Sequence, residues 1–317
     1  MSVSFAFVFP GQGSQAVGML DSWAANAAVR RTLEEASDAL RLDVGQLIHA
    51  GPKEQLDLTA NTQPLMLAAG IACYRAWLDA GGRAPDFLAG HSLGEYTALV
   101  AAGAIAFPDA LRLVRFRAEA MQDAVAVGSG AMAAILGLDA EAVRRGCAEA
   151  AAASGEVVEA VNFNDPKQTV IAGTTAGVDR GCERLKAMGA RRALPLPVSA
   201  PFHSSLMKPA AERLRTRLAE VTIGPPRIPI VNNIDVAVRT APDEIRDALY
   251  RQAFGPVRWV ETIQAIRARG ATHVVECGPG KVLAVMAKRI DPAIATAVVS
   301  DPASLAETRA WLEGVPA

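Results

Sequence analysis

The sequence places a serine between two glycines where a predicted strand meets a predicted helix. Gly90-His91-Ser92-Leu93-Gly94 has the G-x-S-x-G spacing, with a strand expected over 86–90 and a helix from Leu93 onward. A serine on so tight a turn projects its hydroxyl from the end of the strand, and the next backbone N–H points at the same place. The pattern predicts that Ser92 is a nucleophile, and a serine that only caps the helix stays open as the alternative.

A nucleophilic serine needs a general base, and the chain has four histidines. We prefer His203, because the loop over 199–204 leaves the middle of the chain and begins a helix. A structural role for His203 is an equally open interpretation. Of the others, His91 adjoins the serine and is expected to point elsewhere, His273 begins an apolar strand and is expected to be buried, and His49 precedes a Gly-Pro loop and is expected to be exposed.

A glycine-rich loop follows the first predicted strand. Gly11-Gln12-Gly13-Ser14-Gln15-Ala16 satisfies the G-x-G-x-x-A pattern of dinucleotide-binding turns. That fingerprint requires an acidic residue at the end of a second strand, about 20 residues later. Glu34 and Glu35 instead fall within a predicted amphipathic helix. We therefore favour a loop that donates a backbone N–H to an oxyanion hole.

The elements that must position these residues alternate along the chain, which is typical of an α/β protein with a mostly parallel sheet. Strands are predicted over 4–9, 86–90, 228–231, 272–277 and 295–300. Helices are predicted over 23–40, 62–79, 93–103, 108–125, 204–221, 242–252, 260–269, 282–290 and 305–313.

The middle of the chain has a different order of elements. Strands are predicted over 131–136, 157–163, 169–172 and 191–196, and helices over 140–153 and 175–188. This βαββαβ order predicts a ferredoxin-like subdomain at 128–197, inserted between residues 1–127 and 198–317 of the larger α/β core. A cleft between the two is the expected ligand site.

Composition excludes several classes of protein. The 317 residues include 32 Lys+Arg and 33 Asp+Glu, so a nucleic-acid-binding surface of high positive charge is not expected. Cys73, Cys147, Cys182 and Cys277 are too widely spaced for a zinc site or a disulfide framework, so we expect no metal. No apolar run is long enough to span a membrane. We expect a cytoplasmic protein without membrane contact.

Five segments spread over nearly the whole chain form one combined pattern. In sequence order they are Phe9-Pro10-Gly11-Gln12-Gly13-Ser14-Gln15, Gly90-His91-Ser92-Leu93-Gly94-Glu95-Tyr96, Pro201-Phe202-His203-Ser204-Ser205-Leu206-Met207, Pro256-Val257-Arg258-Trp259 and Glu276-Cys277-Gly278-Pro279-Gly280. Taken together, these segments resemble one family, the malonyl-CoA:acyl carrier protein transacylases of bacterial fatty acid synthesis, in which they occur in the same order. The resemblance implies an α/β-hydrolase-like core that carries a ferredoxin-like subdomain.

The resemblance assigns roles to individual residues. It implies that Ser92 is the nucleophile, that His203 is its base, and that the backbone carbonyl of Gln252 orients the histidine in place of a carboxylate. The oxyanion hole would consist of the N–H groups of Gln12 and Leu93. For the substrate, it implies that Arg117 binds the free malonyl carboxylate and that Phe202 and Met121 belong to the acyl site. A guanidinium suits that task because its parallel N–H donors fit a carboxylate.

The implied activity is transfer of malonyl from its coenzyme A thioester to the phosphopantetheine thiol of acyl carrier protein, without a cofactor, by a monomer. Two alternatives remain: a serine hydrolase or thioesterase on the same turn, and the same transfer serving malonate decarboxylase or a polyketide pathway. Carrier proteins of this kind are typically acidic. Arg191, Arg192 and Lys208 flank the His203 loop and are therefore our candidates for the docking surface.

Overall fold

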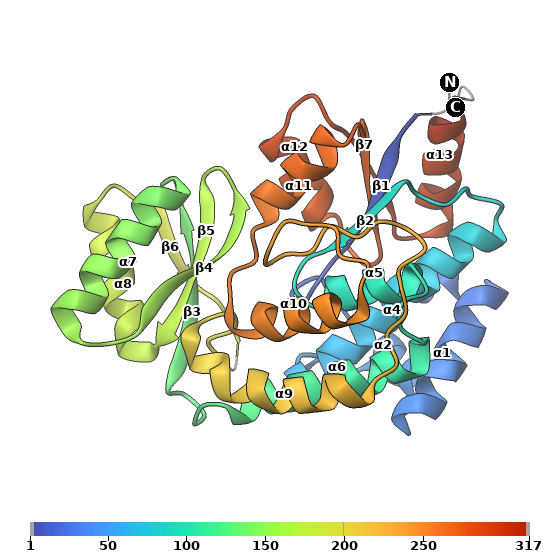
Figure 1. Ribbon diagram of the computed structural model, residues 1–317. Coiled ribbons are helices and arrows are strands. Elements are labelled where there is room, and N and C mark those ends of the chain that lie inside the picture. The colour runs from blue at the N-terminus through green and yellow to red at the C-terminus, as the bar shows by residue number, and fades with distance from the viewer. Residues whose placement is uncertain (1–2, 199, 315–317) are drawn as a thin grey trace.

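A four-stranded parallel sheet forms the centre of the larger part of the molecule (Figure 1). The computed structural model describes residues 3–198 and 200–314. The order of the strands is β2-β1-β7-β8, and all three pairings are parallel. The strands are β1 (Phe5–Phe9), β2 (Phe87–Gly90), β7 (His273–Cys277) and β8 (Ala295–Val299). The predicted α/β class is confirmed.

Helices cover both faces of this sheet because alternate residues of β1 point to opposite sides. Phe5, Phe7 and Phe9 pack into one hydrophobic cluster with Trp77 of α4, and Ala6 and Val8 pack into another. The helices of the core are α1 (Ala27–Leu40), α2 (Val44–Ala50), α3 (Lys53–Leu56), α4 (Thr59–Asp79), α5 (Gly94–Ala101), α6 (Phe107–Asp123), α9 (Lys208–Glu220), α10 (Pro242–Phe254), α11 (Trp259–Ala268), α12 (Val282–Ile290) and α13 (Pro302–Glu313), with 3-10 turns at Asp21–Trp23 and Ser205–Met207.

A second sheet forms the lobe at the left of Figure 1. Its strands are antiparallel in the order β4-β5-β3-β6, with a separate hydrophobic cluster between the sheet and its two helices. Along the chain, the elements of this lobe follow the predicted βαββαβ order. Its elements are β3 (Gly130–Leu136), α7 (Ala140–Ser154), β4 (Val158–Asp165), β5 (Gln168–Thr174), α8 (Thr175–Ala187) and β6 (Arg192–Pro195). The boundaries of this subdomain at residues 128 and 197 stay a prediction.

Three details of the core differ from the sequence prediction. The strand predicted over 228–231 is wrong: Ile230 only forms an isolated bridge to Leu88 of β2. Pro229 has no N–H to donate, which prevents a continuous ladder at this point. The helix predicted from residue 23 begins at Ala27, where the Asn26 side chain accepts the N–H of Val29. The short helices α2 and α3 were not predicted.

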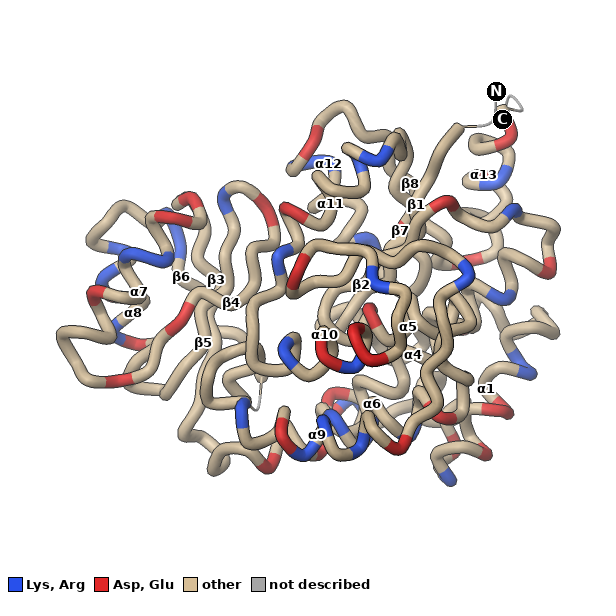
Figure 2. Tube along the Cα trace, in the orientation of Figure 1, with Lys and Arg blue, Asp and Glu red and all other residues tan. Residues whose placement is uncertain are grey.

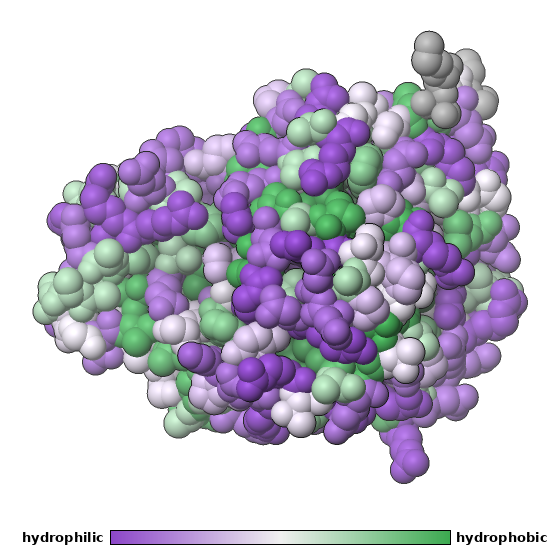
Figure 3. All heavy atoms as spheres, viewed as in Figure 1, coloured by the Kyte–Doolittle hydropathy of each residue, from purple (hydrophilic) through white to green (hydrophobic). Residues whose placement is uncertain are grey.

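Charged residues of both signs are scattered over the whole chain (Figure 2). Figure 3 shows a face on which hydrophilic residues surround smaller hydrophobic areas. In the part of the chain that the structure describes, every helix is too short or too polar to cross a membrane.

Candidate active site

The turn that carries Ser92 lies at the carboxyl end of β2, directly before α5. Ser92 has φ 52°, which is the left-handed conformation that side chains rarely adopt. The turn packs tightly against the end of β1. A Cβ atom on Gly94 would lie 2.1 Å from the backbone oxygen of Phe9, so residue 94 must be glycine. The predicted strand-turn-helix context of Ser92 is therefore present.

His203 and Ser92 are brought together from positions 111 residues apart, with 2.7 Å between His203 Nε2 and Ser92 Oγ. On the other side of the ring, His203 Nδ1 lies 2.9 Å from the backbone oxygen of Gln252. A carbonyl oxygen only accepts hydrogen bonds, so Nδ1 must donate. Nε2 then carries the free lone pair that faces the serine, as a general base requires.

The environment of His203 keeps the imidazole neutral. Burial, and then the positive charge of Arg117, lower the pKa of His203 from 6.5 to about 3. The other histidines lie where the sequence suggested or close to it. His91 is turned toward Asn164 Oδ1 at 2.8 Å, His49 is exposed beside Asp21, and His273 is half-buried against Trp311.

Arg117 reaches Ser92 from the inner face of α6. Its Nη2 donates to Ser92 Oγ over 3.1 Å and lies 3.3 Å from Gln252 Oε1, and its Nη1 donates to Gln63 Oε1 over 2.6 Å. Arg117 is 2% exposed and is the only buried arginine among residues 3–198 and 200–314. Among these described residues, Arg117 has no carboxylate as a hydrogen-bond partner, and its Nε has no hydrogen-bond partner of any kind.

The loop after β1 approaches the same turn. A Cβ atom on Gly11 would lie 2.6 Å from the backbone oxygen of His91, which only glycine allows. This contact places Gln12 beside the serine turn. Within the described part of the chain, the N–H groups of Gln12 and Leu93 have no hydrogen-bond acceptor. Both donors are thus available to a ligand oxygen.

Phe202 directly precedes His203 in the sequence, and Met121 lies about one helical turn after Arg117 on α6. Met121 is fully buried and Phe202 is 9% exposed, and both pack into the large hydrophobic cluster of the core. Their contribution to the acyl site stays a prediction.

A cavity of about 560 Å³ lies between the two sheets, where the sequence predicted a cleft. The larger part contributes the loop over 10–15 and His91, and α12 contributes Met286. The subdomain contributes amide side chains, Asn162, Asn164 and Gln168, together with Leu196. No group of three or more histidine, cysteine, aspartate or glutamate residues suited to hold a metal ion occurs within the described ranges.

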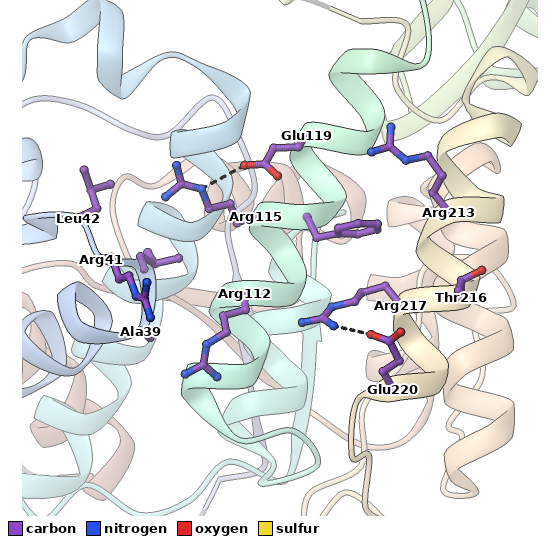
Figure 4. Close-up of a pocket in the computed structure, with 12 residues that line it drawn as sticks. Ala39, Arg41, Leu42, Arg112, Arg115, Glu119, Arg213, Thr216, Arg217 and Glu220 are labelled. Carbon is purple, nitrogen blue, oxygen red and sulfur yellow. Dashed lines mark hydrogen bonds and ion pairs between the residues drawn. The ribbon is translucent and has the colours of Figure 1, made fainter.

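A second hollow, of about 590 Å³, lies on the outer surface between α1, α6 and α9 (Figure 4). It contains five arginines, and four of them form ion pairs with nearby carboxylates, among them Arg115 with Glu119 and Arg217 with Glu220. The residues that line this hollow do not include Ser92, His203 or Arg117. We refer to it as the outer groove.

Several residues of the site were not predicted from the sequence. Gln63 holds Arg117, Asn233 accepts the backbone N–H of Ser92 at 2.8 Å, and Glu95 accepts from Gln252 Nε2 at 2.8 Å. Glu95 lies in the Gly90–Tyr96 segment, but neither the pattern nor the resemblance predicted a role for it. Neither Gln63 nor Asn233 stands in a pattern that marks it as functional.

The chain is similar to known proteins over nearly its whole length. Residues 6–299 match the model of the acyl transferase domain family. The chain is 52% identical over 303 residues to the malonyl CoA-acyl carrier protein transacylase of Escherichia coli strain K12, which covers 95% of this chain and 97% of that protein.

Solved structures agree as well. The acyl-carrier-protein S-malonyltransferase of Burkholderia pseudomallei 1710b superposes with a TM-score of 0.95 at 65% identity, covering 98% of this chain and 100% of the other. A malonyl-transacylase solved in complex with a type II polyketide synthase acyl carrier protein superposes with a TM-score of 0.95 at 49% identity, covering 98% of this chain and 99% of the other.

Proposed function

The chain belongs to the acyl transferase family, among its malonyl CoA-acyl carrier protein transacylases, and from this we propose that it transfers malonyl from coenzyme A to acyl carrier protein through an ester on Ser92. The malonyl carrier so formed would supply fatty acid synthesis. The observation that carries the substrate assignment is the buried guanidinium of Arg117, which touches the nucleophile and has no carboxylate partner. A substrate carboxylate would complete this site.

In the first half-reaction, His203 Nε2 takes the proton of Ser92 Oγ as the oxygen attacks the thioester carbonyl. The tetrahedral oxyanion accepts from the N–H groups of Gln12 and Leu93. The carbon–sulfur bond then breaks, and coenzyme A leaves as the thiol with the proton from His203. The second half repeats these steps with the carrier thiol as nucleophile and Ser92 as leaving group.

Gln252 replaces the triad carboxylate in this scheme. Its backbone oxygen accepts from His203 Nδ1, which holds the tautomer that the base needs. A carboxylate there would stabilise a positive imidazole, whereas the neutral carbonyl leaves the pKa of His203 low. No cofactor takes part in any step.

The cavity between the sheets suits the phosphopantetheine arm that both substrates share. Its amide side chains match the amide groups of such an arm, and Asn162 Oδ1 has no hydrogen-bond partner among the described residues. For the acidic carrier itself, Arg191, Arg192 and Lys208 are exposed and stay our proposed docking residues. Reversal of all three charges should raise the apparent KM for carrier protein, and an unchanged KM would remove them.

Three further expectations accompany the proposal: a monomer, a cytoplasmic location and a reaction without contact with nucleic acid or membrane. A polyketide pathway is the one alternative destination that a comparison favours, because one matched structure contains a polyketide synthase carrier. Transfer assays with both kinds of carrier would decide between the pathways.

The acyl-enzyme provides the direct test. Malonyl-CoA should add one malonyl group to the wild-type protein in intact-mass spectra, and Ser92→Ala should abolish this adduct. Ser205→Ala, at an exposed serine near His203, is the matched control and should keep it. Added holo carrier protein should remove the adduct as malonyl carrier. Loss of the adduct to water at the same rate without carrier would instead support a hydrolase.

A further inference from the structure

The side chain of Asn233 forms hydrogen bonds with two backbone groups of the serine turn. The Ser92 N–H donates to Asn233 Oδ1 over 2.8 Å, and Asn233 Nδ2 donates to the backbone oxygen of Gly90 over 2.8 Å. Asn233 is fully buried. Its amide therefore bridges the residue before the turn and the nucleophile itself, across 141 residues of sequence. A side chain in this place can stabilise the unusual φ of Ser92.

Glu95 connects this asparagine to the catalytic histidine and arginine. Glu95 Oε2 accepts the backbone N–H of Asn233 over 2.9 Å and Gln252 Nε2 over 2.8 Å. The same Nε2 lies 3.1 Å from the backbone oxygen of Ser92. The carboxyl group is 2% exposed, and no arginine or lysine forms an ion pair with it among the described residues.

The acceptors around the Gln252 amide determine how it is oriented. Glu95 Oε2 and the backbone oxygen of Ser92 both act as acceptors, so the NH₂ group of Gln252 must face them, and Gln252 Oε1 must face the other way. That other side is where Arg117 Nη2 lies, at 3.3 Å. The backbone oxygen of the same glutamine receives His203 Nδ1. Glu95 thus orients one residue that contacts both the base and the arginine.

We propose that Asn233 and Glu95 are positioning residues of the transfer reaction, with Asn233 holding the Ser92 backbone and Glu95 orienting Gln252 toward Arg117. Neither residue touches the acyl group. They act through the geometry of the nucleophile and of the arginine, where a displacement of about 1 Å can cost 10²-fold in rate. The inference rests on the proposed Ser92 mechanism.

The two residues should differ in what they affect. Asn233→Ala should slow acylation by malonyl-CoA and by acetyl-CoA alike, about 10- to 10²-fold in kcat, because both acyl groups use the same nucleophile. The KM for each thioester should change by less than about 3-fold. Glu95→Ala should slow malonyl acylation more than acetyl acylation, since it also releases the amide that faces Arg117. Glu95→Gln keeps an oxygen acceptor and should recover part of the loss.

Quench-flow acylation followed by intact-mass detection measures these rates on folded protein, with folding checked by circular dichroism. Thr32→Val is the matched control, because Thr32 is a fully buried polar residue on α1 whose hydroxyl donates to Ala28. It should lower the thermal midpoint while kcat stays at the wild-type value. Where Asn233→Ala does not fold, Asn233→Asp keeps Oδ1 as the acceptor for the Ser92 N–H and replaces the donor to Gly90 by a second acceptor oxygen.

The outcomes separate the two proposals. Asn233 and Glu95 variants that lose thermal stability as Thr32→Val does, yet acylate at the wild-type rate, would overturn the positioning role. An equal effect of Glu95→Ala and Glu95→Gln on both acyl groups would overturn the orientation of Gln252. Absence of an acyl adduct in the wild-type protein would instead contradict the Ser92 mechanism itself.

Discussion

The two faces of α6 carry the same residue type in opposite physical states. Arg117 on the inner face is buried and hydrogen-bonded only to neutral groups. Arg112 and Arg115 face the outer groove (Figure 4), are about one third to one half exposed, and pair with Asp109 and Glu119. Two residues along a helix correspond to a rotation of about 200°, which places Arg115 and Arg117 on opposite sides.

The two faces of α6 also differ in the free energy associated with their arginines. Exposed pairs such as Arg115–Glu119 contribute at most about 1 kcal/mol and are satisfied in themselves. A buried charge without a counterion is expensive and is retained where a ligand supplies the missing charge. The two faces should therefore respond very differently to the same substitution.

The largest effect is expected for Arg117→Ala. Malonyl transfer should fall about 10³-fold or more in kcat/KM, because the substrate carboxylate loses its bidentate partner in a buried site. Acetyl transfer should persist or rise. Arg115→Ala, on the outer face, should leave both within about 2-fold. Equal loss of both acyl groups in Arg117→Ala would contradict the role of this arginine in selecting a carboxylate.

Buried and exposed carboxylates differ in the same way as the buried and exposed arginines. Burial raises the pKa of Glu276 from 4.5 to about 7, although the N–H groups that begin α12 oppose this shift. Because the folded pKa is the higher one, the folded state binds the proton more tightly, and stability is lost as the pH rises from about 4.5 to about 7. The loss is on the order of 3 kcal/mol.

Glu276→Gln should therefore remove this contribution from the pH dependence of the unfolding free energy, as measured by urea denaturation between these two pH values. Glu95 has its pKa raised to about 7 by burial as well, so the contribution of Glu95 should remain. Glu119→Gln in the outer groove is the matched control and should keep the wild-type dependence. The lowered pKa of His203 acts in the opposite direction over this pH range, so the test compares the slopes of the wild type and the variant. Equal slopes would contradict the raised pKa of Glu276.

A smaller effect concerns the acid side of the rate profile. In the proposed mechanism His203 acts only when unprotonated, and Arg117 is the second cause of its low pKa after burial. Arg117→Ala should raise the pKa of His203 and move the acid limb of acetyl transfer to higher pH. Single-turnover rates from pH ~3 to ~7 would measure this. Arg115→Ala should leave the limb in place, and a limb that moves equally in both variants would argue against a direct effect of Arg117.

The smallest effects are expected on the outer face itself. Arg112→Ala and Arg115→Ala should each change the unfolding free energy by about 0.5 kcal/mol or less, because each removes one exposed pair. Urea denaturation measures this directly. A loss of several kcal/mol in either variant would show that the outer groove stabilises α6 far more than its exposure suggests.

The sequence predicted the fold class and the turn that carries Ser92, because both depend on local patterns. Ser92 lies in a local strand-turn-helix pattern, and the βαββαβ order can be seen without any distant contact. The strand over 228–231 was predicted wrongly because an apolar run does not reveal that Pro229 interrupts the ladder. The helices α2 and α3 are too short to show helical periodicity.

Arg117 marks the limit of what residue types alone can show. From composition and spacing it is one of several arginines on a helix, and only the family resemblance singled it out. Nothing in the sequence distinguishes Asn233 or Gln63 from other polar residues. Their importance comes from contacts with Ser92 and Arg117 over 141 and 54 residues of sequence.

The sequence by itself therefore determined the α/β class, the inserted subdomain, the serine turn and the family. Only the tertiary structure decided which arginine is buried without a carboxylate, which carbonyl orients His203, and which buried residues hold the Ser92 backbone. The physical reason is that a local pattern is set by neighbouring residues along the chain. The charge, burial and hydrogen bonding of a site depend instead on groups that packing brings together from distant segments.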